Sequence, residues 1–287
     1  MKFTKLHGTG NDFVLVDARD RRRRDWPKIA RAVCDRHFGI GSDGILLVLD
    51  SAAADYRMVM YNPDGSEAEM CGNGIRCFAR YLFDSKDARG PGLSVETGAG
   101  IKQLEIQTEG GAFRRVVVDM GTPRLAPADI PVLAEGAEVV DLPLDVDGWR
   151  LSLTAVSMGN PHAIHFLDGN VGEFPLEQVG PRVEHDARFP RRVNFEIARV
   201  VNPEAVDVRV WERGAGLTLA CGTGACAVFA AARRKGLVGD RATLRLPGGE
   251  LELRVGPDGQ ILMAGPAEVV FTGEWPESHD EWLNSHE

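Results

Sequence analysis

Two segments decide the fold of this chain: EMCGNGIRCFARYLF at residues 69–83 and LACGTGACAVFAAAR at residues 219–233. Each places a cysteine before a Gly-X-Gly turn, followed by apolar residues at the three- and four-residue spacing typical of a helix. In the second segment Thr223 is the expected N-cap, residues 233–235 put basic side chains in the last turn, and Gly236 follows the end. The two segments therefore read as diverged copies of one cysteine, turn and helix unit.

The similarity extends backward from the two cysteines. Asn11 lies 60 residues before Cys71, and Asn160 lies 61 residues before Cys221; both asparagines follow a glycine and open a strand-like run. A period of about 150 residues is too long for a solenoid repeat. We therefore predict duplication of a whole domain, with the two copies related by a pseudo-twofold axis.

Strands with turn signals make up most of each copy. A strand-like run ends nine residues before each cysteine, at Asn62 after RMVMY and at Glu212 after VDVRVW. The expected fold class is α+β: two pseudo-symmetric domains, each a mainly antiparallel, β-barrel-like sheet wrapped around a central helix. Hairpin signals occur at PDG (63–65), EGG (109–111), PGG (247–249) and PDG (257–259).

The expected domains are residues 1–120 and 121–266, divided near the proline-rich stretch MGTPRLAP, with the active site in the cleft between them. The C-terminal segment, about 267–287, is expected to be able to pack back on the first domain. Two charged segments are expected at the surface: RDRRRRD (19–25) as a solvated turn, and the acidic tail after Glu274 as an appendage.

The charge balance excludes a general nucleic-acid binder. The chain has 33 Lys and Arg against 42 Asp and Glu, a net charge of −9, whereas a nucleic-acid footprint is basic. No apolar run approaches the roughly 18 residues that a membrane span needs, and the polar start MKFTKLHGTGNDF is unlike a signal peptide. We therefore expect a soluble, cytoplasmic enzyme or binding protein with neither a nucleic-acid nor a membrane partner.

The five cysteines, at 34, 71, 77, 221 and 226, are odd in number and irregular in spacing, unlike a secreted disulfide framework. Cys71 and Cys221 each precede a helix, whose backbone amides and dipole favour a thiolate. A cysteine at such a place is expected to have a lowered pKa and can act as a base near neutral pH. Cys34, Cys77 and Cys226 lack this pairing and are predicted to be packing residues.

Two symmetric cysteines permit three kinds of site. A structural disulfide is disfavoured in the cytosol, and the spacings CGNGIRC and CGTGAC lack the close pairs or companion histidines of a zinc site, so no metal is expected. An acid and base pair explains why the motifs are near-copies. Racemisation removes a proton from one face of a carbon and returns one to the other, which requires equivalent groups on opposite sides.

Six blocks, in this order, resemble the diaminopimelate epimerase family from about residue 3 to about residue 270. They are HGTGNDF at the start, RHFGIGSDG (36–44), YNPDGSEAEMCGNGIRCFARY (61–81), MGNPH (158–162), RVNFEIA (192–198) and WERGAGLTLACGTGACA (211–227). The resemblance implies a pyridoxal-independent isomerase without cofactors. It would interconvert L,L- and meso-diaminopimelate, a small-molecule substrate, in lysine and peptidoglycan biosynthesis. It also implies that Cys71 and Cys221 are the thiolate base and the thiol acid, and some relatives are dimers, so a homodimer is among the expectations.

Substrate recognition is expected to need anchors at both ends of this dicarboxylic diamino acid. Helix amides would hold the reacting carboxylate, a glutamate the reacting ammonium, and by resemblance Arg213 and three asparagines the distal head. His162 is similar to a family histidine near the cysteines and is expected to support them. The predicted substrate-binding residues are Asn11, Asn62, Gly72, Asn73, Asn160, Asn194, Glu212, Arg213, Gly222 and Thr223.

One position departs from the family, and two other functions stay open. Many members carry glutamine at the position of Gly44, so here the backbone or a water would replace that contact. A proline or hydroxyproline racemase shares the two-cysteine design but needs no distal anchors. A thiol-based redox sensor would instead form a disulfide between Cys71 and Cys221 in its working state, which we expect only as an inactivation route.

Overall fold

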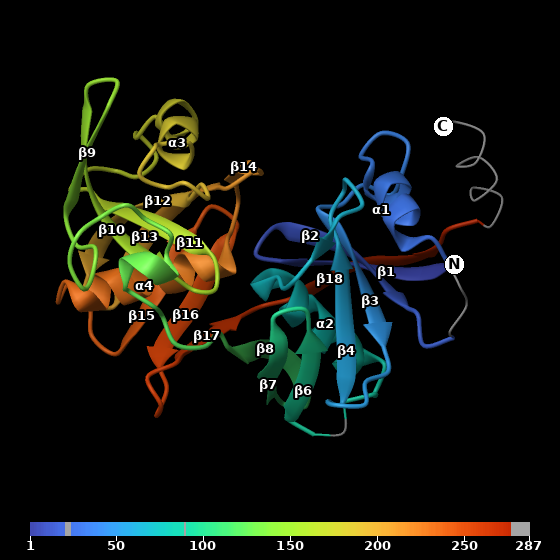
Figure 1. Ribbon diagram of the computed structural model, residues 1–287. Coiled ribbons are helices and arrows are strands. Elements are labelled where there is room, and N and C mark those ends of the chain that lie inside the picture. Colours follow the sequence, from blue (N-terminus) through green and yellow to red (C-terminus); the bar gives the residue numbers. More distant parts are fainter. Residues whose placement is uncertain (21–23, 89, 277–287) are drawn as a thin grey trace. The chain divides into compact units, whose positions relative to one another are not determined.

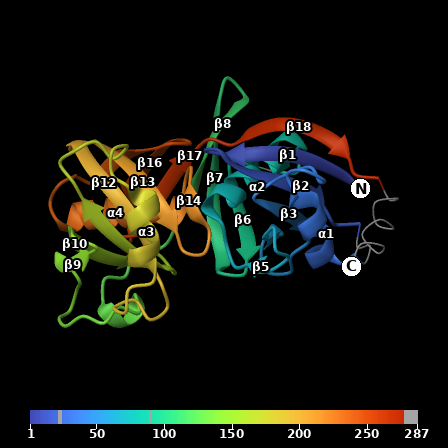
Figure 2. The same cartoon turned by 90° about the horizontal axis from the view of Figure 1, so that it is seen from above.

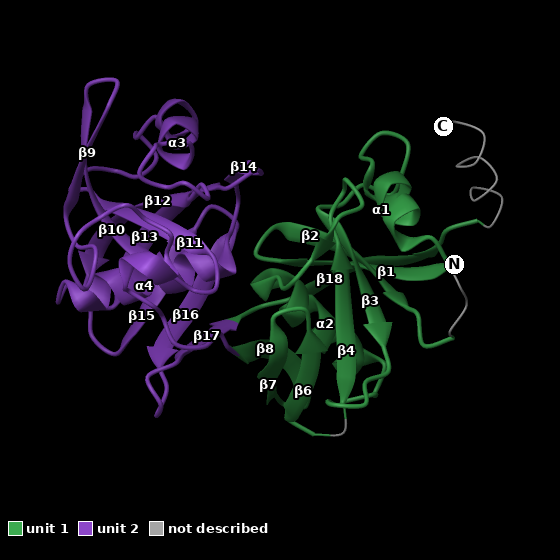
Figure 3. Cartoon of the chain, in the orientation of Figure 1, with its two compact units in different colours: residues 1–118, 265–287 green, residues 119–264 purple. Residues whose placement is uncertain are grey.

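The computed structural model describes residues 1–20, 24–88 and 90–276, and the chain divides into two compact units (Figure 3). Unit 1 comprises residues 1–118 and 265–287, and unit 2 comprises residues 119–264. The expected solvated turn and acidic tail fall in part on residues 21–23 and 277–287, which lie outside the described residues.

Unit 1 is built on one mixed sheet with the strand order β18–β1–β2–β3–β4–β6–β7–β8 (Figures 1 and 2). The pairs β2–β3 and β4–β6 are parallel and the others are antiparallel; β5 pairs with β4. The elements are β1 (Lys2–Gly8), β2 (Asn11–Asp17), α1 (Trp26–Cys34), β3 (Gly44–Leu49), β4 (Tyr56–Tyr61), β5 (Glu67–Ala68), α2 (Gly72–Asp84), β6 (Gly92–Thr97), β7 (Gly100–Glu109), β8 (Ala112–Asp119) and β18 (Glu268–Glu274).

Unit 2 repeats this plan with the order β9–β10–β11–β12–β13–β15–β16–β17, and β14 pairs with β13. Here β11–β12 and β13–β15 are the parallel pairs. The elements are a 3-10 turn (Pro127–Asp129), β9 (Leu142–Val146), β10 (Trp149–Ser157), β11 (Pro161–Phe166), α3 (Leu176–Glu184), β12 (Asn194–Asn202), β13 (Ala205–Glu212), β14 (Gly216–Thr218), α4 (Gly222–Arg234), β15 (Arg241–Leu246), β16 (Gly249–Val255) and β17 (Ile261–Gly265).

The two copies match in register. Phe13 pairs with Gly44 across β2–β3, and His162 pairs with Asn194 across β11–β12. The strands at the start of the two strand orders, β9 and β18, come from different places in the sequence. β9 directly precedes its partner β10, whereas β18 (Glu268–Glu274) pairs with β1 (Lys2–Gly8) from the other end of the sequence. The predicted α+β class, with two pseudo-symmetric and mainly antiparallel copies, is confirmed.

The central helices supply the core of each unit. α2 contacts β1, β2, β3, β4 and β7, and α4 contacts β10, β11, β12, β13, β15 and β16, so each sheet bends around its helix. Phe78 on α2 and Phe229 on α4 are fully buried. The Gly-X-Gly start of each helix is thereby fixed against the sheet, and the cysteine before it is fixed as well.

Each unit also has a second helix that the sequence analysis did not predict. α1 joins β2 to β3 and α3 joins β11 to β12, as parallel neighbours need a crossover connection. At the start of α1, Asp25 accepts a hydrogen bond from the Lys28 amide and a proline occupies the first turn. The sequence DWPK therefore carried an N-terminal helix signal that was missed.

The four predicted hairpin turns all connect antiparallel strands: β4 to β5, β7 to β8, β15 to β16, and β16 to β17. At two further hairpins, Thr9–Gly10 and Asp147–Gly148, both turn residues have positive φ. Two-residue turns of this kind match the twist of the flanking strands. The Thr9–Gly10 turn brings the start of β2 back to the N-terminus of α2.

The core of unit 1 can be tested at Phe78. Replacing Phe78 by alanine leaves a cavity between α2 and the sheet, and we expect the free energy of unfolding to fall by about 3–5 kcal/mol. Phe38 is 76% exposed, so Phe38→Ala should change it by less than about 0.5 kcal/mol. Urea denaturation of both variants measures the difference; equal losses would contradict the packing described.

Candidate active site

Each of the two repeated cysteines, Cys71 and Cys221, is the N-cap of a central helix. Cys71 has φ −135° and ψ 121°, and its Sγ accepts a hydrogen bond from the Gly74 amide at 3.4 Å. Cys221 has φ −124° and ψ 115°, and its Sγ accepts from the Gly224 amide at 3.4 Å. The prediction of Thr223 as the N-cap is wrong, because Thr223 already lies inside α4 and the thiol sulfur does the capping.

The last glycine of each motif lies in tight packing. A β-carbon at Gly74 would lie 3.2 Å from Leu46 Cδ2. At Gly224 it would lie 2.8 Å from Glu196 Oε1 and 3.4 Å from Cys221 Sγ. The absence of side chains lets the sheet approach the first turn of each helix and lets the sulfur reach the amide.

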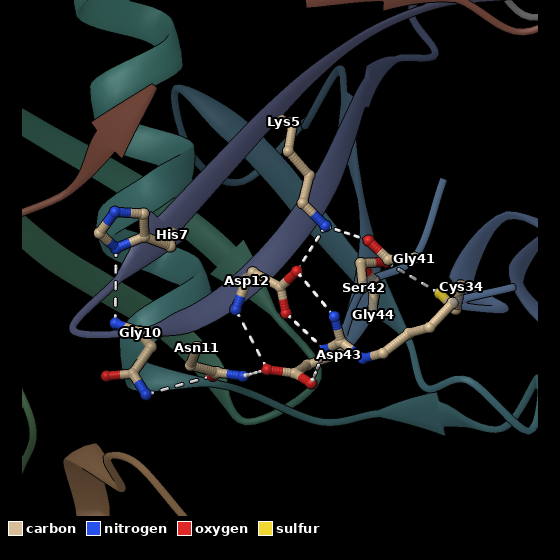
Figure 4. Close-up of polar contacts among 12 residues, drawn as sticks. Lys5, His7, Gly10, Asn11, Asp12, Cys34, Gly41, Ser42, Asp43 and Gly44 are labelled. Atoms are coloured by element: carbon tan, nitrogen blue, oxygen red, sulfur yellow. Dashed lines mark hydrogen bonds and ion pairs between the residues drawn. The ribbon is translucent and has the colours of Figure 1, made fainter. Parts of the chain in front are cut away.

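In unit 1, Asn11 connects Cys71 to a charged pair; Figure 4 shows Asn11 beside Asp43. Its Oδ1 faces Cys71 Sγ at 3.7 Å and accepts a hydrogen bond from Asn73 Nδ2 at 3.2 Å. Its Nδ2 donates to Asp43 Oδ2 at 2.7 Å, and Asp43 Oδ1 pairs with Arg36 at 2.7 Å. Asn11 is thus oriented from both ends, with its carbonyl oxygen toward the thiol.

Charged groups on β1 and β2 support this arrangement (Figure 4). Lys5, which is only 6% exposed, pairs with Asp12 at 2.5 Å and also donates to the Gly41 carbonyl. Burial by itself would raise the pKa of Asp12, but hydrogen bonds from Arg36 and Lys5 outweigh it and lower the pKa to about 2. This carboxylate therefore stays ionised and holds the β1–β2 hairpin in place.

In unit 2, a chain of hydrogen bonds connects Cys221 to a buried glutamate. Thr223 Oγ1 lies 3.4 Å from Cys221 Sγ and accepts from Asn160 Nδ2 at 3.2 Å. Asn160 Oδ1 lies 3.0 Å from His162 Nε2, and His162 Nδ1 lies 2.6 Å from Glu196 Oε1. His162 and Glu196 are fully buried. Hydrogen bonds through Asn160 and Thr223 thus connect His162, the predicted supporting residue, to the Cys221 sulfur.

The pKa of Cys221 departs from the expectation drawn from its helix. Burial raises this pKa well above 9.0, and the nearby carboxyl groups of Glu212 and Glu196 raise it further by repelling a thiolate. Hydrogen bonds from Thr223 and from the Gly224 amide act in the opposite direction but do not outweigh burial. The helix N-terminus therefore does not by itself make Cys221 a thiolate.

Glu212 is the last residue of β13 and belongs to the surroundings of Cys221. Its Oε1 accepts a hydrogen bond from Thr218 Oγ1 at 2.6 Å. Burial raises the pKa of Glu212, whereas the hydrogen bonds from Thr218 and Cys221 lower it. An ammonium group bound here would be close to the Cys221 sulfur.

The predicted distal residues differ in how they are used within the protein. Asn194 is 3% exposed; its Oδ1 accepts from the Arg213 amide at 2.8 Å and its Nδ2 donates to the Pro161 carbonyl at 2.8 Å. It therefore holds the Arg213 backbone. Arg213 donates to the Arg191 carbonyl at 3.1 Å, and Asn62 donates to Ser66 Oγ at 3.0 Å within its own turn.

Sequence reasoning missed the buried carboxylates behind these residues. Glu184 on α3 is 3% exposed and accepts from Trp211 Nε1 at 2.8 Å and from the Gly214 amide at 3.0 Å, which fixes the WERG turn. Glu196 is the third residue of β12, between the apolar residues Phe195 and Ile197. A charged residue within an otherwise apolar strand was the available signal.

Gly44 has no room for a side chain here, because a β-carbon would lie 2.9 Å from the Tyr61 carbonyl oxygen. The neighbouring strand β4 thus fills the space beside Gly44, and the glutamine contact expected from the family resemblance has no counterpart at this position. Cys34, Cys77 and Cys226 are buried, as predicted for packing residues, and burial raises the pKa of Cys77 to about 12.

Among the residues that the structure describes, no group of three or more His, Cys, Asp and Glu side chains is arranged to hold a metal ion. Within the same residues, every helix is too short or too polar to cross a bilayer.

Comparison with known proteins identifies the family. The family model described as "Diaminopimelate epimerase" matches residues 3–126 and 154–270. The chain belongs to the diaminopimelate epimerase family. A diaminopimelate epimerase of Methanococcus maripaludis is 50% identical over 275 residues, covering 96% of this chain and 99% of that protein. One of Moorella thermoacetica is 50% identical over 278 residues, with the same coverage.

Solved structures show the fold that the diaminopimelate epimerase family shares with other proteins. A probable proline racemase from Agrobacterium radiobacter has a TM-score of 0.72 at 16% identity, covering 99% of this chain and 95% of that one. A phenazine biosynthesis protein of the PhzF family from Bacillus anthracis has a TM-score of 0.71 at 19% identity, covering 96% and 99%. At these identities the likeness concerns the fold alone.

The raised pKa of Cys221 in this diaminopimelate epimerase family member predicts a pH dependence of stability. An unfolded thiol ionises near pH 8.5, so above that pH only the unfolded chain loses this proton, and stability falls by about 1.4 kcal/mol per pH unit. This contribution is complete below pH 8 and is lost as pH rises toward the folded pKa. Cys221→Ser lacks it, so the stability difference between wild type and variant should shrink as the pH rises from 8 to 10. Urea titrations at both pH values measure it; parallel curves would contradict the assignment.

Proposed function

We propose that the protein is a diaminopimelate epimerase, which interconverts L,L- and meso-diaminopimelate without an organic cofactor or a metal. The observation that carries the proposal is the duplicated N-cap cysteine, found in a chain aligned with diaminopimelate epimerases over 96% of its length. The product serves lysine and peptidoglycan synthesis. A cytoplasmic location and a homodimer stay predictions of the sequence analysis.

The reaction is proposed to use Cys71 and Cys221 as two bases. One sulfur, as the thiolate, forms an S–H bond with the α-proton, and the C–H electron pair stays on carbon, delocalised into the carboxylate. The S–H bond of the other cysteine then breaks and its proton is delivered to the opposite face of that carbon. Charge balances, and the enzyme is left with the two protonation states exchanged.

Negative charge that develops on the substrate carboxylate needs preorganised donors. In α4 the first intrahelical bond runs from the Ala225 amide to the Cys221 carbonyl at 2.9 Å, so the amides of Gly222 and Thr223 precede the helical ladder. In α2 the corresponding bond runs from Ile75 to Cys71 at 2.9 Å. We propose that these helix N-termini, with Gly72 and Asn73 in α2, bind the reacting carboxylate.

The remaining polar groups are proposed to select the substrate. Glu212 would hold the reacting ammonium beside Cys221, and Arg213 would bind the distal carboxylate through its planar guanidinium. Asn62 and Asn160 would contact the distal amino-acid head. Asn11, the counterpart of Asn160 in the first copy of the repeat, would also contact the substrate. Asn194 would act through the Arg213 backbone that it holds.

A proline or hydroxyproline racemase is the alternative enzyme, and a thiol-based redox sensor is the alternative of another class. Proline has one carboxylate and no distal head, so an enzyme for it has no use for Arg213 or for the Glu184 support of the WERG turn. A redox sensor would not need Glu212 beside Cys221. Both features favour the epimerase.

The direct test is to incubate the purified protein with L,L-diaminopimelate and, separately, with L-proline, and to resolve the stereoisomers. We expect meso-diaminopimelate to form and proline to stay unchanged. Cys71→Ala and Cys221→Ala should each lower the rate by about 10²–10⁴-fold or more, because each removes an obligatory proton-transfer group.

Cys77→Ala and Cys226→Ala are matched controls on the same two helices and should retain activity. Circular dichroism confirms that each variant folds. Substantial activity in Cys71→Ala or Cys221→Ala would contradict the two-base mechanism.

Isotope entry gives an independent check on the two bases. In D₂O each substrate stereoisomer should acquire solvent deuterium first in the product of opposite configuration, because the incoming proton comes from the second thiol. Mass analysis of separated stereoisomers at low conversion measures this. Equal early labelling of substrate and product would instead indicate a single base that exchanges its proton.

A further inference from the structure

Glu184 is a buried carboxylate that takes no direct part in the proposed reaction. It is 3% exposed and is the last residue of α3, the end of a helix at which the dipole disfavours negative charge. Arg192 Nη1 lies 3.7 Å from its Oε1, on a side chain that is 57% exposed. Burying a carboxylate is costly unless its oxygens are hydrogen-bonded, so the partners of Glu184 indicate what it is for.

Both oxygens of Glu184 bond to the WERG turn, residues 211–214. Oε2 accepts a hydrogen bond from Trp211 Nε1 at 2.8 Å, and Oε1 accepts one from the Gly214 amide at 3.0 Å. The Trp211 ring also packs on α3, because a β-carbon at Gly180 would lie 2.6 Å from its Cγ. The first and the last residue of the turn are thus attached to α3.

Arg213, inside this turn, is held between two buried side chains. Its own amide donates to Asn194 Oδ1 at 2.8 Å, and the next amide, that of Gly214, donates to Glu184. Asn194 is fixed in turn, because its Nδ2 donates to the Pro161 carbonyl at 2.8 Å. Two consecutive amides with fixed acceptors set the direction in which the Arg213 side chain leaves the backbone.

Three positions around this turn differ together between the two copies of the repeat. Each residue in unit 2 lies 150 residues after its counterpart in unit 1, as Cys221 does after Cys71. The pairs are Cys34 and Glu184, each the last residue of a nine-residue helix, Gly44 and Asn194, and Pro63 and Arg213.

The unit 1 residues at these positions form a set without the two acceptors. Pro63 has no amide hydrogen to donate, and the position that would supply its acceptor is Gly44, which has no side chain. Cys34 is uncharged, and its Sγ accepts a hydrogen bond from Ser42 Oγ at 3.2 Å (Figure 4). The buried carboxylate and the asparagine therefore occur in the copy that carries an arginine in its turn.

The turn itself closes in the same way in both copies. The Gly65 amide donates to the Asn62 carbonyl at 2.9 Å in unit 1, and the Ala215 amide donates to the Glu212 carbonyl at 3.1 Å in unit 2. A buried carboxylate is therefore not needed to make this turn. What unit 2 adds is a fixed direction for one side chain.

We propose that Glu184 is a positioning residue that, together with Asn194, holds Arg213 for the second carboxylate of the substrate and so determines the preference for a dicarboxylic amino acid. The inference rests on the proposed function, in which Arg213 binds the distal carboxylate. A planar guanidinium binds a carboxylate through two parallel hydrogen bonds, so its direction decides the strength of the pair. Glu184 acts through the turn and needs no contact with the substrate.

The first test separates binding from turnover. In Glu184→Gln one oxygen becomes an NH₂ group that cannot accept from the turn, so the KM for diaminopimelate should rise about tenfold or more while kcat changes less than about threefold. A loss of folded protein alone would lower kcat and leave KM unchanged, which would overturn the inference. Glu177→Gln removes an exposed carboxylate from the first turn of the same helix and should change neither constant.

A double-mutant cycle assigns the effect to Arg213. Arg213→Ala removes the guanidinium, so adding Glu184→Gln to it should raise KM no further if Glu184 acts through Arg213. The same factor in both backgrounds would show that Glu184 acts elsewhere and would overturn the inference. Glu184→Cys carries the residue that unit 1 has at this place, and it takes the place of Glu184→Gln in the cycle if that variant folds poorly.

The closing test measures binding and needs no turnover, so its outcome is separate from that of the proposed function. Isothermal titration calorimetry gives the Kd of L-α-aminopimelate, which has a second carboxylate, and of L-α-aminoheptanoate, which lacks it. The wild type should bind the first about tenfold or more tightly, and Glu184→Gln should remove most of this preference by weakening the first alone. A wild type that does not epimerise diaminopimelate would contradict the proposed reaction. A wild type without the preference, or an unchanged preference in the folded Glu184 variants, would overturn the inference.

Discussion

The structure depends on a sulfur atom that accepts a hydrogen bond from a helix N-terminus. Cys71 and Cys221 cap α2 and α4, and each sulfur receives the third amide of its helix at 3.4 Å. This contact goes with an extended backbone at the cysteine, and it leaves the amides of the first helical turn free to bind an anion beside the sulfur. Because the helix is the centre of each unit, the sheet around it positions the chemistry.

Duplication supplies equivalent groups, and divergence then makes them different. Asn11 and Asn160 occupy matching positions, but one leads to the Asp43–Arg36 pair and the other to His162 and the buried Glu196. An enzyme that takes a proton from one face and returns it to the other needs two like groups in opposite states. Identical surroundings would give both thiols the same proton affinity, whereas the polar neighbours of the two cysteines differ here.

The cysteine motif, the repeat, the fold class and the four hairpin turns could be predicted from the sequence because each leaves a local signature. Thr223 was misjudged because residue preferences for caps favour hydroxyl side chains, whereas the close contact at Gly224 selects the sulfur. The raised pKa of Cys221 could not be predicted, since it depends on Glu212 and Glu196 from neighbouring strands. Helix-terminus chemistry is local, but burial and cross-strand charge are properties of the assembled sheet.

The return of β18 to β1 has a kinetic consequence. Unit 2 is one continuous stretch, whereas unit 1 closes its sheet edge only when β18 pairs with β1. The N-terminal amine also donates a hydrogen bond to the Trp275 carbonyl, across 274 residues of sequence. Such non-local pairing carries the largest loop-closure entropy and is slow to form. Unit 2 can therefore complete its own sheet while unit 1 still has an open edge along β1, an edge that closes only when β18 pairs with it.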